Sequence, residues 1–146
     1  MKLFFDEDMG SGVPKALYDL NLDGVSVLWA VKVFRKRRRA GEKISDEIWI
    51  PFAGQAVSLA ISANRAILES DPQRELLIEH NVGSVFMASG EYSNFDTMKL
   101  LLRKWGWLNA IHLNEPRPFA YIVNLAGRTR KDPRVFKPED EQLRLL

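Results

Sequence analysis

The sequence contains no cysteine among its 146 residues. This absence excludes a disulfide scaffold, cysteine-based zinc and iron–sulfur sites, and a cysteine nucleophile. Long hydrophobic runs are missing as well, since the apolar stretches fall far short of the roughly 20 residues that a membrane-spanning helix needs. The N-terminal segment reaches an acid at Asp6, which is too early for a secretory signal peptide. Together these absences predict a cytoplasmic protein with no membrane partner.

What is present is the composition of an ordinary globular protein, with 46% hydrophobic and 27% charged residues. The length suits one domain with a sizeable core. The net charge of +2 hides a strong asymmetry. Seven basic residues and one acid between Lys32 and Lys43 give that window +6, which leaves −4 for the rest of the chain. A local run of this density favours an anionic partner.

Hydrophobic patterning predicts strands that alternate with helices. Strands are expected at 3–5, 25–31, 56–61, 84–88 and 119–125. Helices are expected over 13–20, from 46 with Ser45 as N-cap, from 72 with Asp71 as the cap, and over 94–109. This order favours βαβ units and a largely parallel sheet. Residues 1–127 form the predicted domain, and residues 128–146 a charged C-terminal arm.

Acids and amides follow the predicted strands, at the edge of a parallel sheet where sites gather. The first strand is followed by Asp6, Glu7 and Asp8, the third by Asn64, and the fourth by Glu91, while Asp46 and Glu47 begin a helix. Converging carboxylates repel one another unless a divalent cation neutralises them, and oxygen ligands without sulfur suit Mg²⁺ or Mn²⁺. The alternative is that these acids merely cap helices and end strands in water, with about even weight for Asp46.

The basic run predicts sequence-independent contact with a phosphate backbone. The alternative is a solvated surface that only keeps the protein soluble. Three aromatic residues flank the run and could stack on bases, although a core position is the stronger expectation. They are Trp29, Phe34 and Trp49.

Several short segments, taken in order, resemble the PIN-like ribonucleases, in particular the VapC-type toxins that pair with helix-turn-helix antitoxins. The matching segments, which span about residues 2–125, are Phe5-Asp6-Glu7, Ala16-Leu17, Ser45 to Trp49, Ile61 to Ile67, Val82-Gly83 and Arg117 to Ala120. The resemblance implies a three-layer α/β/α sandwich around a mainly parallel sheet. It also implies cleavage of RNA phosphodiester bonds with Mg²⁺ or Mn²⁺.

When the family's functional positions are carried over to this sequence, the resemblance implies that Asp6 is the main metal ligand, with Glu7 beside it. Asp46 becomes the acid from the next helix, with Glu47 adjacent. The family's Ser/Thr-x-Asp at a strand end falls on Ser62-Ala63-Asn64, so an uncharged amide stands where the family has a carboxylate. Such a loss of charge weakens a magnesium site. The acids that could compensate are Glu69, Asp71 and Glu91.

The first functional hypothesis is therefore a metal-dependent endoribonuclease toxin. Its catalytic residues are Asp6, Asp46 and Asn64, its metal ligands Asp6, Glu7 and Asp46, and its RNA-binding residues Arg35, Lys36, Arg37, Arg38, Arg39, Ser62 and Arg65. Its partners are RNA and a cognate helix-turn-helix antitoxin, with a homo-oligomer as an open option. The second hypothesis is a catalytically reduced module that binds RNA or an antitoxin without cleaving. A receiver-like domain is disfavoured, because Asn64 stands where its phospho-accepting aspartate belongs.

Overall fold

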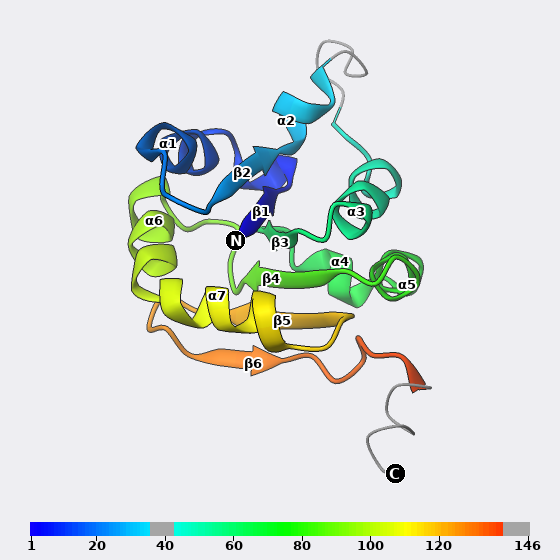
Figure 1. Cartoon of the computed structure of the whole chain (residues 1–146). Coiled ribbons are helices and arrows are strands. Elements are labelled where there is room, and N and C mark those ends of the chain that lie inside the picture. Colours follow the sequence, from blue (N-terminus) through cyan, green and yellow to red (C-terminus); the bar gives the residue numbers. More distant parts are fainter. Residues whose placement is uncertain (36–42, 139–146) are drawn as a thin grey trace.

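The computed structural model describes residues 1–35 and 43–138. The strands in these ranges are β1 (Lys2–Phe5), β2 (Ser26–Trp29), β3 (Leu59–Ser62), β4 (Gly83–Met87), β5 (Phe119–Val123) and β6 (Thr129–Lys131). The helices are the 3-10 helix η1 (Glu7–Met9) and α1 (Gly12–Leu20), α2 (Ala30–Val33), α3 (Asp46–Gln55), α4 (Ala66–Glu69), α5 (Asp71–Glu79), α6 (Asn94–Arg103) and α7 (Trp105–Asn114). Figure 1 shows the strands stacked between two groups of helices.

The described strands form one sheet in the order β2-β1-β3-β4-β5-β6. All neighbours pair in parallel except β5 and β6, which are antiparallel. Phe5 lies opposite Trp29 on one side and Ile61 on the other, so β1, β2 and β3 end at the same edge of the sheet. We call this the carboxyl edge. The chain leaves β1 there at Asp6.

Side chains of successive strand residues point to opposite faces of the sheet, and each face has its own core. Leu3 and Phe5 of β1 pack with residues of α1, α6 and α7. Phe4 packs on the other face with residues of α3, α4 and α5, and its ring stacks on that of Trp49 at 5.7 Å between centroids. A mainly parallel sheet buried on both faces confirms the predicted α/β/α sandwich.

Three strands are shorter than the sequence predicts, and the one expected over 119–125 ends at Val123. The strand expected over 25–31 ends at Trp29, where its partner β1 also ends, and the chain turns into α2. The strand expected over 56–61 begins only at Leu59, which lies opposite Leu3 at the start of the β1 pairing. Val57 has a φ of 52° in the turn that precedes it. Hydropathy alone does not mark the end of β2 or the start of β3, because pairing with β1 sets both limits.

The helix predicted over 94–109 is in fact two helices, α6 and α7, with a bend at Lys104. The apolar pattern continues across the bend because Leu101 of α6 and Leu108 of α7 pack into the same core. The cap of α5 also differs from the prediction. Ser70 is the N-cap, and Asp71 is the first helical residue.

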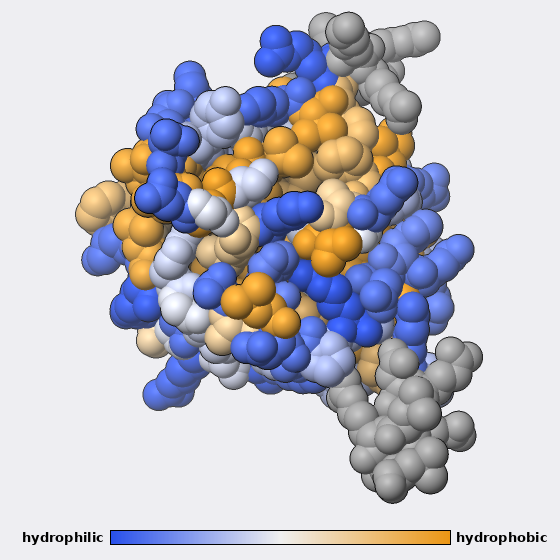
Figure 2. Space-filling view, viewed as in Figure 1, coloured by the Kyte–Doolittle hydropathy of each residue, from blue (hydrophilic) through white to orange (hydrophobic). Residues whose placement is uncertain are grey.

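Part of the segment predicted as a charged arm, 128–146, belongs to the sheet. Residues 129–131 form β6 against β5, and Val135 packs into the core beneath α3 to α5. Residues 139–146 lie outside the described residues. On the face drawn in Figure 2, hydrophobic residues gather at the left flank near α1 and α6 and at the upper right over α2 and α3. Across the described ranges, every helix is too short or too polar to span a lipid bilayer.

Candidate active site

Asp6 stands at the carboxyl edge as the first residue after β1, and it is also the N-cap of η1. Its side chain is buried, with 1% of its surface exposed. The Oδ2 atom accepts a hydrogen bond from Ser62 Oγ at 2.5 Å, and Oδ1 accepts one from the Met9 backbone N–H at 3.3 Å. Ser62 ends β3, so this contact ties the acid to the neighbouring strand. The carboxylate is therefore held in a fixed orientation.

Asp46 is the first residue of α3, directly after the N-cap Ser45 whose side chain accepts a hydrogen bond from Glu47 N–H. Its carboxylate is half-buried, and Oδ1 accepts a hydrogen bond from the indole N–H of Trp49 at 2.8 Å. The other oxygen accepts a hydrogen bond from the side-chain amide of Gln73 on α5. Two elements thus fix the position of Asp46.

The carboxylates of Asp6, Asp8 and Asp46 act on one another electrostatically. The pKa of Asp6 is raised to about 7, mainly by burial and to a smaller extent by the charges of Asp8 and Asp46, while the hydrogen bonds from Ser62 and Met9 oppose the shift. The pKa of Asp46 is also raised, first by burial and then by the charge of Asp8. Ionised acids that repel one another at a partly buried position are destabilising unless a cation offsets their charge. Asp8 itself is exposed, and Lys43 Nζ lies 3.4 Å from its Oδ1.

Glu7, predicted as a metal ligand, has a different contact in this structure. Its Oε2 accepts a hydrogen bond from the backbone N–H of Ile44 at 2.5 Å. Ile44 immediately precedes the N-cap of α3, so Glu7 helps to set where that helix starts. Its role as a ligand stays a prediction.

Asn64 follows β3 at the same edge and is half-buried. Its backbone N–H donates a hydrogen bond to Ser62 Oγ at 2.9 Å, which orders the turn beside Asp6. The acids proposed to compensate for Asn64 are engaged elsewhere or exposed. Glu69 pairs with Arg134 at 3.1 Å, Asp71 pairs with Arg74, and Glu91 is exposed.

The predicted RNA-binding residues are only partly described. Arg65 is exposed just after β3, and Arg35 is exposed just after α2, so both stand near the carboxyl edge. Ser62 is buried against Asp6. Lys36, Arg37, Arg38 and Arg39 lie outside the described residues.

The acid pair fits a hard divalent cation by its chemistry. Magnesium keeps several waters and is commonly bound by only one or two carboxylates, and a cation would relieve the repulsion that raises both pKa values. Each carboxylate oxygen accepts one protein hydrogen bond and retains further lone pairs. In the part of the chain that the structure describes, no group of three or more acids or histidines is arranged to hold a metal ion.

The sequence places Asp8 among the acids at the sheet edge without indicating a role for it in the site, and it does not connect Trp49 or Gln73 with Asp46. For Asp8 a signal existed, namely the run of three acids after the first strand. Trp49 lies one helical turn after Asp46, a spacing at which side chains meet. Gln73 carries no local signal, since it is 27 residues from Asp46 along the chain.

Comparison with known proteins agrees with this arrangement. The family model described as a PIN-like domain matches residues 1–89, well over half of the chain and the stretch that holds Asp6, Asp46 and Asn64. No curated protein and no solved structure matches the sequence significantly. With its parallel sheet and its acids at the carboxyl edge, the chain belongs to the PIN-like domain family.

Proposed function

We propose that this protein is a metal-dependent endoribonuclease and the toxin of a type II toxin–antitoxin pair. The observation that carries the proposal is the acid pair Asp6 and Asp46 at the carboxyl edge of the sheet of a PIN-like domain. Both pKa values are raised first by burial and then by the charges of neighbouring acids. Acids whose pKa values are shifted in this way are candidates for catalysis.

Each residue of the site has a defined task in this proposal. Ser62 and the Met9 N–H hold the Asp6 carboxylate, while Trp49 and Gln73 hold that of Asp46. A Mg²⁺ or Mn²⁺ ion bound by these two acids would supply Lewis-acid activation of the scissile phosphodiester. Arg65 and Arg35, both exposed near the same edge, would hold the RNA phosphates without reading sequence.

The toxin role is supported by the order of the segments that resemble VapC-type toxins. A neighbouring helix-turn-helix antitoxin and action in the cytoplasm belong to this proposal. Expression of the wild-type chain in a bacterial host should arrest growth, whereas Asp6→Asn should not. Growth arrest by both proteins at equal expression would contradict a toxin that acts through this site.

Asn64 supports a second candidate, a module that binds RNA or an antitoxin without cleaving it. An uncharged amide at this position lowers the negative charge available to a divalent cation. This candidate predicts RNA binding that falls steeply with salt and persists in chelator, with no cleavage product.

The deciding experiment combines Mn²⁺ calorimetry with an RNA-cleavage gel. The wild type should bind Mn²⁺ and cleave RNA only in its presence, and Asp6→Asn should lose both properties. Glu75→Gln, which removes an exposed acid from α5, is the matched control and should behave as wild type.

Asn64→Asp separates the two candidates. If the wild type binds no Mn²⁺ and Asn64→Asp restores binding, the chain is the non-cleaving module. If the wild type cleaves and Asn64→Asp changes little, the amide is tolerated in a working nuclease. Mn²⁺-dependent cleavage that survives Asp6→Asn would contradict the assignment of Asp6.

A further inference from the structure

Tyr18, Trp29 and Lys32 form a compact cluster of two rings and one cation. The rings of Tyr18 on α1 and Trp29 on β2 meet edge to face, with centroids 5.8 Å apart and planes at 74°. The Lys32 ammonium lies 3.5 Å from the Tyr18 centroid and 4.8 Å from that of Trp29. We call these three residues the aromatic–lysine cluster. The proposed catalytic site makes no use of it.

The cluster is open to solvent and close to the acid site. About half of Tyr18 is exposed (51%), and Trp29 and Lys32 are half-buried. Trp29 lies directly opposite Phe5, the residue before Asp6, in the parallel pairing of β2 with β1. Adjacent strands are about 4.8 Å apart. The cluster therefore stands one strand away from the carboxylate at which RNA would be cut.

A hollow of about 530 Å³ opens beside Tyr18, between α1 and the outer side of β2. Its lining includes Leu17, Asn21, Val25 and Val27. Within the described sheet, β2 pairs only with β1, so its outer backbone N–H and C=O groups make no ladder with another described strand. The hollow thus combines an apolar wall, an aromatic ring and backbone hydrogen-bonding groups, which are the features that bind a planar polar heterocycle.

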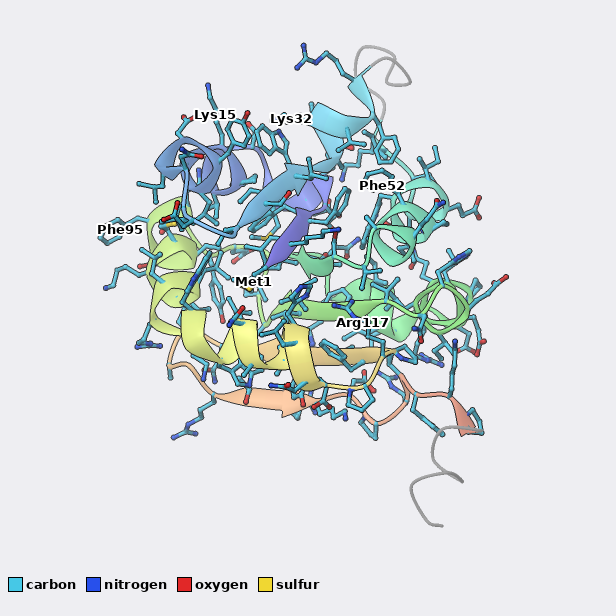
Figure 3. The ribbon with its side chains drawn as sticks, in the orientation of Figure 1. Met1, Lys15, Lys32, Phe52, Phe95 and Arg117 are labelled. Atoms are coloured by element: carbon cyan, nitrogen blue, oxygen red, sulfur yellow. The ribbon has the colours of Figure 1, made fainter. Side chains whose placement is uncertain are left out.

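Basic residues lie on the elements that carry the cluster. Figure 3 shows Lys15 of α1 and Lys32 of α2 on neighbouring elements at this end of the molecule. Arg35 is exposed three residues after Lys32, and the sequence continues from it into the basic run Lys36 to Arg39. One acid, Asp19 of α1, is among the residues that line the hollow. Exposed rings beside basic residues are the combination by which proteins hold single-stranded nucleic acid.

We propose that the aromatic–lysine cluster binds one nucleobase and the adjoining phosphate of single-stranded RNA, next to the catalytic acids. The base takes the place of the Lys32 ammonium on the Tyr18 ring, Trp29 fixes that ring from the side, and the displaced ammonium contacts the phosphate. The inference deepens the proposed ribonuclease function and rests on it. Such a site needs an unpaired base, because only an unpaired base can leave its stack to meet a ring.

The test measures RNA affinity without cleavage, by fluorescence anisotropy in EDTA with a short labelled oligouridylate. We expect Tyr18→Ala to weaken binding about fivefold or more, the lower end of what one base–ring stack contributes. Tyr18→Phe keeps the ring and should stay within about twofold of wild type. Lys32→Gln should weaken RNA binding. It should also reduce the slope of log affinity against log salt concentration by about the contribution of one phosphate contact.

The matched control is Phe95→Ala. Phe95 on α6 is also an exposed ring (71%) with a lysine above it, since Lys99 Nζ lies 5.5 Å from its centroid. It lies on a different flank of the molecule in Figure 3, well apart from Lys32. This variant should bind RNA as the wild type does. A labelled duplex RNA of the same length is the second control, and Tyr18→Ala should not weaken its binding because its bases are not available for stacking.

The outcomes separate this inference from the ribonuclease proposal. If Tyr18→Ala binds oligouridylate as tightly as the wild type, or loses duplex binding equally, the base site is wrong. In that case the cluster is only a packing contact between α1 and β2. Mn²⁺-dependent cleavage by the wild type would leave the nuclease proposal standing even then. A specific loss in Tyr18→Ala supports the base site, whether or not cleavage is seen.

Discussion

Asp6 combines near-complete burial with a carboxyl group whose pKa is raised to about 7. Burial is the main cause, and the charges of Asp8 and Asp46 add to it, while the hydrogen bonds from Ser62 and Met9 oppose it. The group is therefore close to half ionised near neutral pH when no cation is bound. An acid in this state is destabilising to the fold, which is typical of residues in functional sites and supports the proposed role of Asp6.

The raised pKa of Asp6 predicts how stability depends on pH without metal. Between the ordinary value of 3.8 and about 7, the folded protein holds the Asp6 proton while the unfolded chain releases it. The free energy of unfolding should therefore fall as pH rises through this window, by up to about 4 kcal/mol. In Asp6→Asn, the free energy of unfolding should lose most of this dependence on pH. Urea unfolding in EDTA at several pH values measures it, and identical pH profiles for both proteins would contradict the prediction.

Gln73 is predicted to act as a positioning residue for Asp46, because its amide donates to the carboxylate from a separate helix. Gln73→Ala should weaken Mn²⁺ binding about tenfold, the lower end of what partners behind a metal ligand contribute. Calorimetry measures the change, and Gln55→Ala, at an exposed glutamine on α3, is the control. Rescue of the affinity by Gln73→Asn is not expected, since the shorter side chain does not reach. Unchanged affinity in Gln73→Ala would show that Trp49 alone holds Asp46.

At the scale of elements, the placement of Asp46 depends on how closely α3 and α5 pack. Gly54 of α3 allows that approach, because a Cβ atom there would lie 2.2 Å from the backbone carbonyl oxygen of His80. A backbone oxygen at the end of α5 cannot move aside as a flexible side chain can. The same contact brings Gln73 to Asp46, so the helix pair and the site are built together.

Gly54→Ala is therefore expected to destabilise the protein, although alanine favours helix by about 1 kcal/mol over glycine. Overpacking of this kind costs about 1–3 kcal/mol, so the steric effect should win. Urea unfolding measures the free energy. Gly106→Ala is the control, since nothing lies within 4 Å of a Cβ at that helical glycine, and it should be neutral or stabilising. A stabilised Gly54→Ala would mean that the two helices separate easily.

At the scale of the whole molecule, the chain does not leave the fold after β5. Val135 has 1% of its surface exposed, the Asp132 backbone N–H bonds to Ala120 O at 2.8 Å, and Arg134 joins Asp132 and Glu69. Together with β6, the bond from Asp132 pairs backbone groups of β5 that would otherwise be exposed at the edge of the sheet. An uncovered strand of this kind is prone to pair with other chains.

Val135→Ala should accordingly lower the free energy of unfolding by about 2 kcal/mol, as removal of buried methyl groups does. Phe136→Ala changes the next residue, which is 42% exposed, and should have a much smaller effect. Thermal or urea unfolding compares the two. Equal effects of both substitutions would show that the segment after β5 is not part of the cooperative unit.

The sequence by itself determined the largely parallel sheet, the helix start at Ser45 and the positions of Asp6 and Asp46 at the ends of their elements, while the resemblance to PIN-like domains implied the sandwich. These features are local: apolar runs make buried strands, a serine caps a helix, and an acid directly after an apolar run has left the strand. Trp49 and Phe34 were likewise expected in the core, and both are buried there. Local signals suffice wherever the determining contacts lie within a few residues.

Only the tertiary structure decided the rest. β2 ends at Trp29, opposite the last residue of β1, and β3 begins at Leu59, where its pairing with β1 begins. Neither limit is therefore marked in its own segment. The turn of the chain at Lys104, the pairing of β6 with β5 and the contact of Gln73 with Asp46 join segments that hydropathy treats separately. The physical reason is common to all of them. Hydrogen-bond partners and packing neighbours that are distant along the chain fix these features, and a linear pattern does not contain them.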